Sequence, residues 1–158
     1  RVSFGSLLQR YGYDPEASHD LIARFLDLRH DVTFYPDVIP ALSWLSERFT
    51  LIAVSNGNAD ISRLGIAGFF QGQISARAAG VKKPDPVIFG KACELLAAKP
   101  SEVLHVGDHP LEDVIGAQQA GLKGVWVNRN GETWSHQITP HAVVEDLAQL
   151  VDLLEQTE

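Results

Sequence analysis

The sequence predicts an α/β fold in which helices cover both faces of a parallel sheet. Short apolar runs alternate with longer segments whose apolar residues recur every three or four positions. Short apolar runs are typical of buried strands, and the longer period is typical of amphipathic helices. Because parallel strands need a crossover between them, regular alternation of the two patterns favours a parallel sheet. With 158 residues, 45% of them hydrophobic, the chain is long enough to bury the core of one such domain.

Two helices are expected before the first strand. Apolar residues at helical spacing, closed by Gly12, predict a helix over residues 2–11. A turn at Asp14-Pro15 leads into a second helical pattern over residues 16–29. We expect residues 1–33 to form an N-terminal piece that is separate from the rest of the chain.

Helices and strands alternate over the remaining residues, 34–158. Helices are predicted over residues 37–48, 59–64, 84–97, 112–120 and 146–155. Strands are predicted over residues 50–54, 73–76, 103–106 and 125–127, and a further short apolar run lies at 142–144. Pro86 in the first turn of one helix and Gly121 after the end of another are favoured at those positions. This order of elements is typical of a Rossmann-like sheet with flanking helices.

Composition and charge exclude several classes of partner. The net charge is −7, with 20 acidic and 13 basic residues, and the basic residues are scattered, which argues against nucleic acid. No apolar run approaches the roughly 20 residues of a membrane-spanning helix, so we expect no membrane partner. The single cysteine, Cys93, excludes a disulfide framework within the chain. Without a secretion signal we expect a cytoplasmic protein, and nothing in the sequence indicates its oligomeric state.

Polar residues follow the first predicted strand. In an open parallel sheet, ligands bind in the crevice beyond the carboxyl ends of the strands. Ser55-Asn56-Gly57 provides a hydroxyl at that place, together with a glycine-containing turn whose amides can point at an anion. The same three residues are also a common turn that binds no ligand, and the residues alone leave both interpretations open.

A lysine stands just before the helix start that Pro84 fixes. An ammonium held there, on Lys83, could neutralise a phosphate group. The alternative interpretation is that Lys82 and Lys83 are a solvated surface pair, which is the usual situation of adjacent lysines.

Two carboxylates follow the third predicted strand. Gly107 ends the apolar run, and Asp108 and Asp113 come soon after it. Carboxylates suit Mg²⁺, which is bound by one or two of them together with waters and phosphate oxygens of a substrate. The alternative is that Asp108 only turns the chain and that Asp113 caps or decorates the next helix. Each segment is weak evidence alone, but all three lie at the edge of the same predicted sheet.

Together, the three segments resemble the motifs of the haloacid dehalogenase-like hydrolases. Ser55-Asn56-Gly57 is similar to the second motif of that family, Lys83-Pro84-Asp85-Pro86 to the third, and Gly107-Asp108 with Asp113 to the fourth. The resemblance extends over about residues 34–127 and implies the α/β core of the family. It also implies that residues 1–33 are the remnant of a helical cap, which in this family follows the first strand.

The resemblance implies a Mg²⁺-dependent phosphatase that acts on a small phosphorylated metabolite. In this family the phosphoryl group passes to an aspartate and is then released by water, through an aspartyl phosphate. The residues that would bind the phosphate are Ser55, Asn56, Gly57 and Lys83. Of these, Ser55 and Lys83 would be catalytic. Asp108 would hold the Mg²⁺, with Asp113 in or just outside its coordination shell.

One motif of the family has no counterpart in these 158 residues. The first motif, an apolar strand ending in Asp-x-Asp, supplies the nucleophile and the general acid, and no Asp-x-Asp occurs in the sequence. That strand belongs in the middle of the sheet, between the strands that carry Ser55 and Asp108. Without it, each backbone group that is left buried and unpaired costs about 1–3 kcal/mol. We therefore expect a truncated chain that is inactive alone, or a central strand supplied by another chain.

Two other functions stay open at this point. A 2-haloacid dehalogenase shares the Ser-Asn-Gly motif and the lysine but needs no metal, and the acids Asp108 and Asp113 favour the phosphatase over it. A non-catalytic binding domain that has lost the first motif would show the same sequence features.

Overall fold

The computed structural model describes residues 4–57 and 59–156. The chain divides into two compact units, Arg1–Thr33 and Phe34–Glu158, and each is described by itself. The first unit consists of α1, Phe4–Arg10, and α2, Ala17–Leu28. Residues 2 and 3 of the helix predicted over 2–11 lie outside the described residues. Many apolar side chains of these two helices are exposed, and that the unit is the remnant of a cap stays a prediction.

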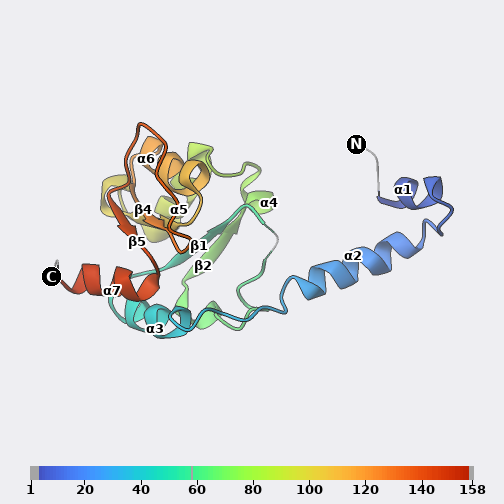
Figure 1. Ribbon diagram of the computed structural model, residues 1–158, viewed down its shortest axis with the longest axis horizontal. Helices are drawn as coiled ribbons and strands as arrows, with labels where there is room; N and C mark the ends of the chain where they lie inside the picture. The colour runs from blue at the N-terminus through green and yellow to red at the C-terminus, as the bar shows by residue number, and fades with distance from the viewer. Residues whose placement is uncertain (1–3, 58, 157–158) are drawn as a thin grey trace. The chain divides into compact units, whose positions relative to one another are not determined.

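Five parallel strands of the described residues form the centre of the second unit (Figure 1). In one sheet, β1, Ile52–Ser55, pairs with β2, Gly72–Ser75. In the other sheet, β4, Lys123–Val127, lies between β3, Leu104–Gly107, and β5, Ala142–Val144. Every pairing is parallel, which confirms the predicted α/β fold.

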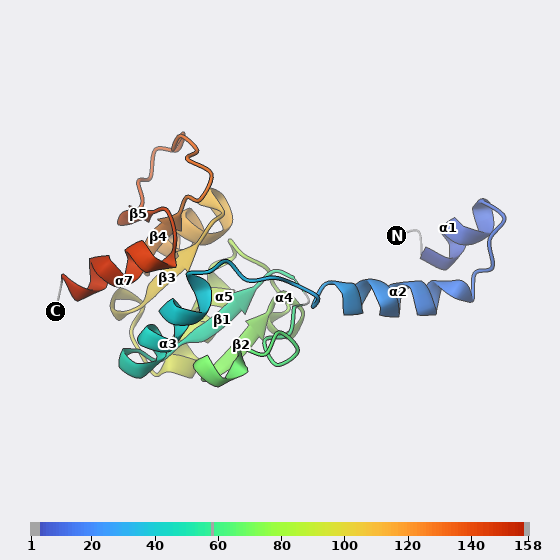
Figure 2. The same ribbon diagram turned by 60° about the horizontal axis from the view of Figure 1, so that its bottom comes forward.

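Helices connect and cover these strands (Figure 2). They are α3, Val38–Arg48; α4, Ala76–Ala79; α5, Pro86–Leu96; α6, Gly116–Gln119; and α7, Leu147–Glu155. Short 3-10 helices lie at Ala67–Phe69 and Pro100–Glu102, and a wider π-helical turn, Pro110–Ile115, leads into α6. Among the described residues, no helix combines the length and the apolar character needed to cross a membrane.

The two faces of the strands are covered by different helices. On β3, the side chains of Leu104 and Val106 pack into the cluster formed by α3, α7, β4 and β5. His105, which points to the opposite face, contacts the ring of Phe89 on α5 edge-on, with 5.1 Å between the ring centroids. This alternation follows from the two-residue period of a strand, and it places helices on both sides of the sheet, as predicted.

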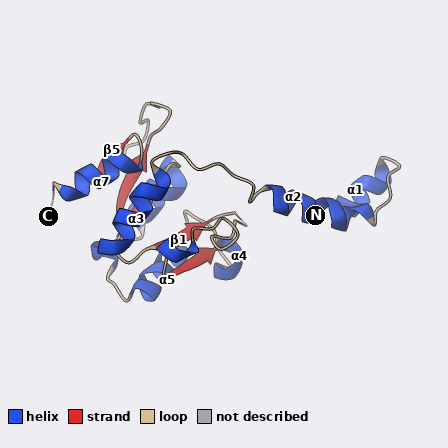
Figure 3. Cartoon of the chain, turned by 90° about the horizontal axis from the view of Figure 1, so that it is seen from below, coloured by secondary structure: helices blue, strands red, loops and turns tan. Residues whose placement is uncertain are grey.

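The strands form two separate sheets (Figure 3). Within the described part of the chain, β1 and β3 are each an edge strand, and no strand pairing joins them. All residues of β1 and β3 are half-buried, whereas Gly124, Val125 and Trp126 in β4 are buried. The sheet is therefore divided between β1 and β3, which is where the sequence resemblance places the strand of the first motif.

The helix predicted over residues 59–64 is wrong, because residues 61–65 form turns. The side chain of Gln73 on β2 accepts a hydrogen bond from the N–H of Ile61 at 3.1 Å and donates one to the carbonyl of Ala59. A helix would need that carbonyl for its own hydrogen-bond ladder. The segment is therefore held against β2 by these hydrogen bonds and does not form the predicted helix.

The helix predicted over residues 112–120 begins earlier, at Pro110. His109 caps it, since its ring nitrogen Nδ1 accepts a hydrogen bond from the N–H of Glu112 at 3.2 Å. The other predicted elements of this unit differ from the observed bounds by no more than two residues.

Candidate active site

Polar side chains meet where β1 and β3 end. Hydrogen bonds join residues from the end of β1, from the segment before α5 and from the turn after β3. These residues, which we call the polar cluster, are Asn56, Lys83, His105, Glu112 and Asp113. The structure thus brings together residues from all three segments that the sequence singled out.

Lys83 is the positive charge of the polar cluster. It is only 9% exposed, whereas Lys82 beside it is exposed. The ammonium Nζ donates to Asp113 Oδ1 at 2.6 Å and to the carbonyl of Val54 at 3.1 Å. An ammonium has three hydrogens, so these contacts use two of them and one can serve an anion. Burial of the lysine is tolerated because its charge is paired with a carboxylate.

The side chain of Asn56 is used within the protein. Its Oδ1 accepts from the N–H of Lys83 at 2.7 Å, and its Nδ2 donates to the carbonyl of Lys83 at 3.0 Å. Nδ2 also donates to Glu112 Oε2 at 2.8 Å. Both amide hydrogens are therefore engaged, so the contact to phosphate predicted for Asn56 would have to come from its backbone.

Asp113 is the buried negative charge of the polar cluster and is 5% exposed. Its Oδ1 accepts from Lys83 and, at 3.1 Å, from Nε2 of His105, while its Oδ2 accepts from the N–H of His109 at 3.0 Å. Burial by itself raises the pKa of Asp113, but the hydrogen bonds from His105 and Lys83 and the lysine charge hold that pKa well below its usual range. The carboxylate is therefore ionised at neutral pH and serves as the counter-ion of Lys83.

Asp108 is the other predicted metal ligand. It follows β3 and is exposed, and its carbonyl accepts a hydrogen bond from Nε1 of buried Trp126 at 2.9 Å. The ring of Trp134 lies edge-on against Trp126, with 5.0 Å between the centroids. In residues 4–57 and 59–156, no group of three His, Cys, Asp or Glu side chains could hold a metal ion. That Asp108 and Asp113 hold Mg²⁺ therefore stays a prediction, and it needs further ligands beyond these two carboxylates.

Ser55 ends β1, and the turn that follows is shaped by its own side chain. Ser55 Oγ accepts from the N–H of Gly57 at 2.9 Å. This contact leaves the hydroxyl hydrogen for a further acceptor such as a phosphoryl oxygen. The amide of Gly57 is already bound to Ser55, so an anion would have to displace that bond to reach it.

Comparison with known proteins identifies the family. Residues 6–121 match the family model described as a haloacid dehalogenase-like hydrolase. The chain belongs to the haloacid dehalogenase-like hydrolases. Three residues of the polar cluster belong to the motifs that resemble those of this family. They are Asn56 in the second motif, Lys83 in the third and Asp113 in the fourth.

Relatives of this hydrolase include phosphatases and dehalogenases. Glyceraldehyde 3-phosphate phosphatase of Methanopyrus kandleri is 41% identical over 137 residues, which are 80% of this chain and 58% of that protein. The crystal structure of a 2-haloacid dehalogenase from Pseudomonas syringae has a TM-score of 0.88 at 38% identity, and the match covers 98% of this chain and 69% of that one. The hydrolase YfnB of Bacillus subtilis, described as bound to magnesium, has a TM-score of 0.78 at 26% identity and is matched over 69% of its length by 96% of this chain. The chain spans 58–61% of the length of the curated relatives it matches first.

Sequence reasoning gave no role in the site of this hydrolase to His105 or Glu112. The signal for His105 was a polar side chain inside an apolar strand, which needs a buried hydrogen-bond partner. Glu112 stands directly before Asp113, and only the fold shows that its carboxylate reaches Asn56, which follows β1 in the other sheet.

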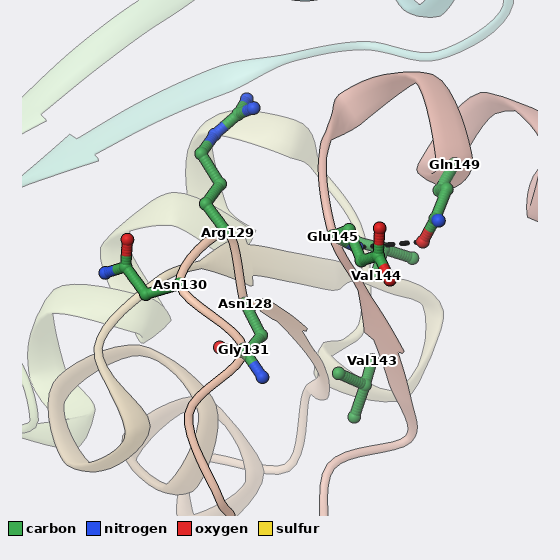
Figure 4. Close-up of a pocket in the computed structure, with 8 residues that line it drawn as sticks. All are labelled: Asn128, Arg129, Asn130, Gly131, Val143, Val144, Glu145 and Gln149. Carbon is green, nitrogen blue, oxygen red and sulfur yellow. Dashed lines mark hydrogen bonds between the residues drawn. The ribbon is translucent and has the colours of Figure 1, made fainter.

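A separate surface hollow of about 450 Å³ lies beside β5 and the start of α7 (Figure 4). Its described lining residues are Asn128, Arg129, Asn130, Gly131, Val143, Val144, Glu145 and Gln149. Arg129 donates to Asp37 at 3.1 and 2.5 Å and lies over the ring of Tyr35. The hydrogen bond from Arg129 holds the pKa of Asp37 below its ordinary value, against the effect of burial. Arg129 and Asp37 form a structural ion pair. The described lining of the hollow contains no residue of the three hydrolase motifs.

Proposed function

We propose that the complete protein is a Mg²⁺-dependent phosphatase that hydrolyses the phosphomonoester of a small metabolite. The observation that carries the proposal is the buried ammonium of Lys83, held by Asp113 and by the carbonyl of Val54 with one hydrogen left to serve an anion. A fixed cation at the carboxyl end of a strand suits a phosphoryl oxygen. The phosphatase from Methanopyrus kandleri, at 41% identity, supports the same reaction class.

The contacts of each residue support a distinct role. Lys83 would offset the charge of the phosphoryl group, and the hydroxyl of Ser55 would donate to one of its oxygens. Asp113 would keep the ammonium charged and in place. When bound at Asp108, Mg²⁺ would neutralise and orient the phosphoryl group.

In this proposal the attacking carboxylate lies outside these 158 residues. The unpaired edges of β1 and β3 leave a place for a strand that carries Asp-x-Asp. By resemblance, its first aspartate would attack phosphorus, the ester oxygen would leave with a proton from the second aspartate, and water would then release phosphate. The 158-residue chain by itself is accordingly expected to be inactive.

The test compares two substrates with the complete protein. We expect hydrolysis of p-nitrophenyl phosphate that needs Mg²⁺ and stops on addition of EDTA, with no halide release from 2-chloropropionate. Mg²⁺-dependent hydrolysis by the pure 158-residue chain would contradict the proposal that the nucleophile lies outside these residues.

A 2-haloacid dehalogenase is the second candidate, favoured by the TM-score of 0.88 to the enzyme from Pseudomonas syringae. Halide release that survives EDTA would establish it and overturn the phosphatase. A folded complete protein without either activity, and without Asp-x-Asp upstream of Arg1, would instead indicate a binding domain.

A further inference from the structure

Glu112 connects the two sheets of the second unit. It lies in the π-helical turn after β3, and Asn56, whose Nδ2 donates to Glu112 Oε2 at 2.8 Å, lies at the end of β1. The bond is charge-assisted, because the acceptor is a carboxylate, and such bonds are stronger than those between neutral groups. Glu112, which follows β3, therefore restrains the amide of Asn56, which follows β1.

The Asn56 amide in turn fixes the backbone of Lys83. One carboxamide accepts from the N–H of Lys83 and donates to the carbonyl of the same residue, at 2.7 and 3.0 Å. Two bonds to one residue imitate the pairing of a neighbouring strand, so they set both the position and the direction of the chain at Lys83. Glu112 accepts the second hydrogen of Nδ2. All three hydrogen bonds of the carboxamide then hold it in one orientation.

The backbone position of Lys83 limits where its ammonium can lie. From this fixed position, Nζ reaches the carbonyl of Val54 and Asp113 Oδ1, and its third hydrogen has a set direction. We infer that Glu112 is a positioning residue, which through Asn56 holds Lys83 in the geometry needed to bind a phosphoryl oxygen. This inference rests on the proposed phosphatase function for its catalytic consequence, but the hydrogen bonds can be tested independently of activity.

The first experiment measures amide hydrogen exchange of Lys83 in the complete protein by NMR. Its N–H is bonded to Asn56 Oδ1, so we expect exchange to accelerate about three- to tenfold in Glu112→Ala and at least as much in Asn56→Ala. Glu112→Gln keeps an oxygen that can accept from Asn56, and its exchange should stay within about twofold of the parent chain. Circular dichroism checks that each variant is folded.

Glu102 provides the matched control. Its carboxylate likewise accepts one hydrogen bond, here from the backbone N–H of Lys99 at 3.0 Å, and Glu102 is not a member of the polar cluster. Glu102→Ala should leave the exchange rate of Lys83 unchanged. An unchanged Lys83 rate in folded Glu112→Ala would overturn the inference, whatever the activity of the complete protein.

The second experiment uses kinetics of the complete protein with p-nitrophenyl phosphate. We expect Glu112→Ala to lower kcat about tenfold and Glu112→Gln to recover most of the loss, because the amide oxygen of glutamine can still accept from Asn56. If Glu112→Gln were as slow as Glu112→Ala while Lys83 exchange stayed normal, the charge itself would be required and the positioning role would be wrong. If the exchange results held and the parent protein hydrolysed no phosphate ester, the proposed function would fail and the structural link would stand.

Discussion

Replacing Asp113 by asparagine tests the central ion pair of the site. The change keeps the shape of a side chain that is 5% exposed but removes its charge, which leaves the ammonium of Lys83 buried without a counter-ion. Asparagine also has one acceptor oxygen in place of two, so Lys83, His105 and the N–H of His109 cannot all be satisfied.

The magnitude follows from the burial of both partners. Removing one member of a buried ion pair costs about 3–5 kcal/mol, because an uncompensated charge is left behind. With a urea dependence of about 2 kcal/mol per molar for a small protein, the unfolding midpoint of Asp113→Asn should fall by about 1.5–2.5 M. Asp152→Asn, an exposed carboxylate on α7, serves as the control and should change the free energy of unfolding by less than about 0.5 kcal/mol.

The effect of Asp113→Asn on the free energy of unfolding should also depend on pH. The pKa of Asp113 is lowered in the folded state, so its contribution is present above the unfolded-state pKa of about 3.9 and is lost as pH falls toward the folded-state pKa. The difference in free energy of unfolding between the parent chain and Asp113→Asn should therefore be constant near neutral pH and shrink below about pH 4. A midpoint shift smaller than about 0.5 M, or a difference that grows on acidification, would refute the buried pair.

Three further substitutions have definite expected outcomes. Gly107→Ala would place a Cβ 2.3 Å from Cγ of Asp113, so it should displace that carboxylate and lower the urea midpoint, as Asp113→Asn does. Ala97, which ends α5 with a φ of 51°, should gain about 0.5–1 kcal/mol of stability on change to glycine, measured as a higher Tm, whereas Ala98→Gly should not raise it. Asp108→Asn in the complete protein should weaken Mg²⁺ binding and reduce turnover by a large factor, and an unchanged Mg²⁺ dependence of the rate would contradict its assignment.

The elements that sequence could predict are those determined by local pattern. The apolar run before Gly107 and the helix start at Pro86 needed no knowledge of distant residues, and the structure has both. The helix predicted over 59–64 failed because Gln73, which is distant in the chain, binds Ala59 and Ile61. A long-range side-chain contact of this kind leaves no trace in the local periodicity.

The candidate site shows the same division between local and long-range information. The residue types at Ser55, Lys83 and Asp108 indicated the chemistry, because each follows a strand or precedes a helix. Asp113 pairs with Lys83, and the side chain of Asn56 binds the backbone of Lys83. Both contacts depend on how the ends of the two sheets approach each other. These partners come from segments about 27 to 30 positions apart, and no spacing rule within one segment could have joined them.

The indole of Trp126 gives the protein an internal optical probe. Its N–H is bonded to the carbonyl of Asp108, and its ring is shielded by Trp134, so its emission depends on the conformation of the turn that carries this carboxylate. Trp44, on α3, stacks with Arg48 and can be replaced by phenylalanine to remove its background signal. Binding of a ligand at the turn that carries Asp108 could then be followed by intrinsic fluorescence, without a label and without an assay of turnover.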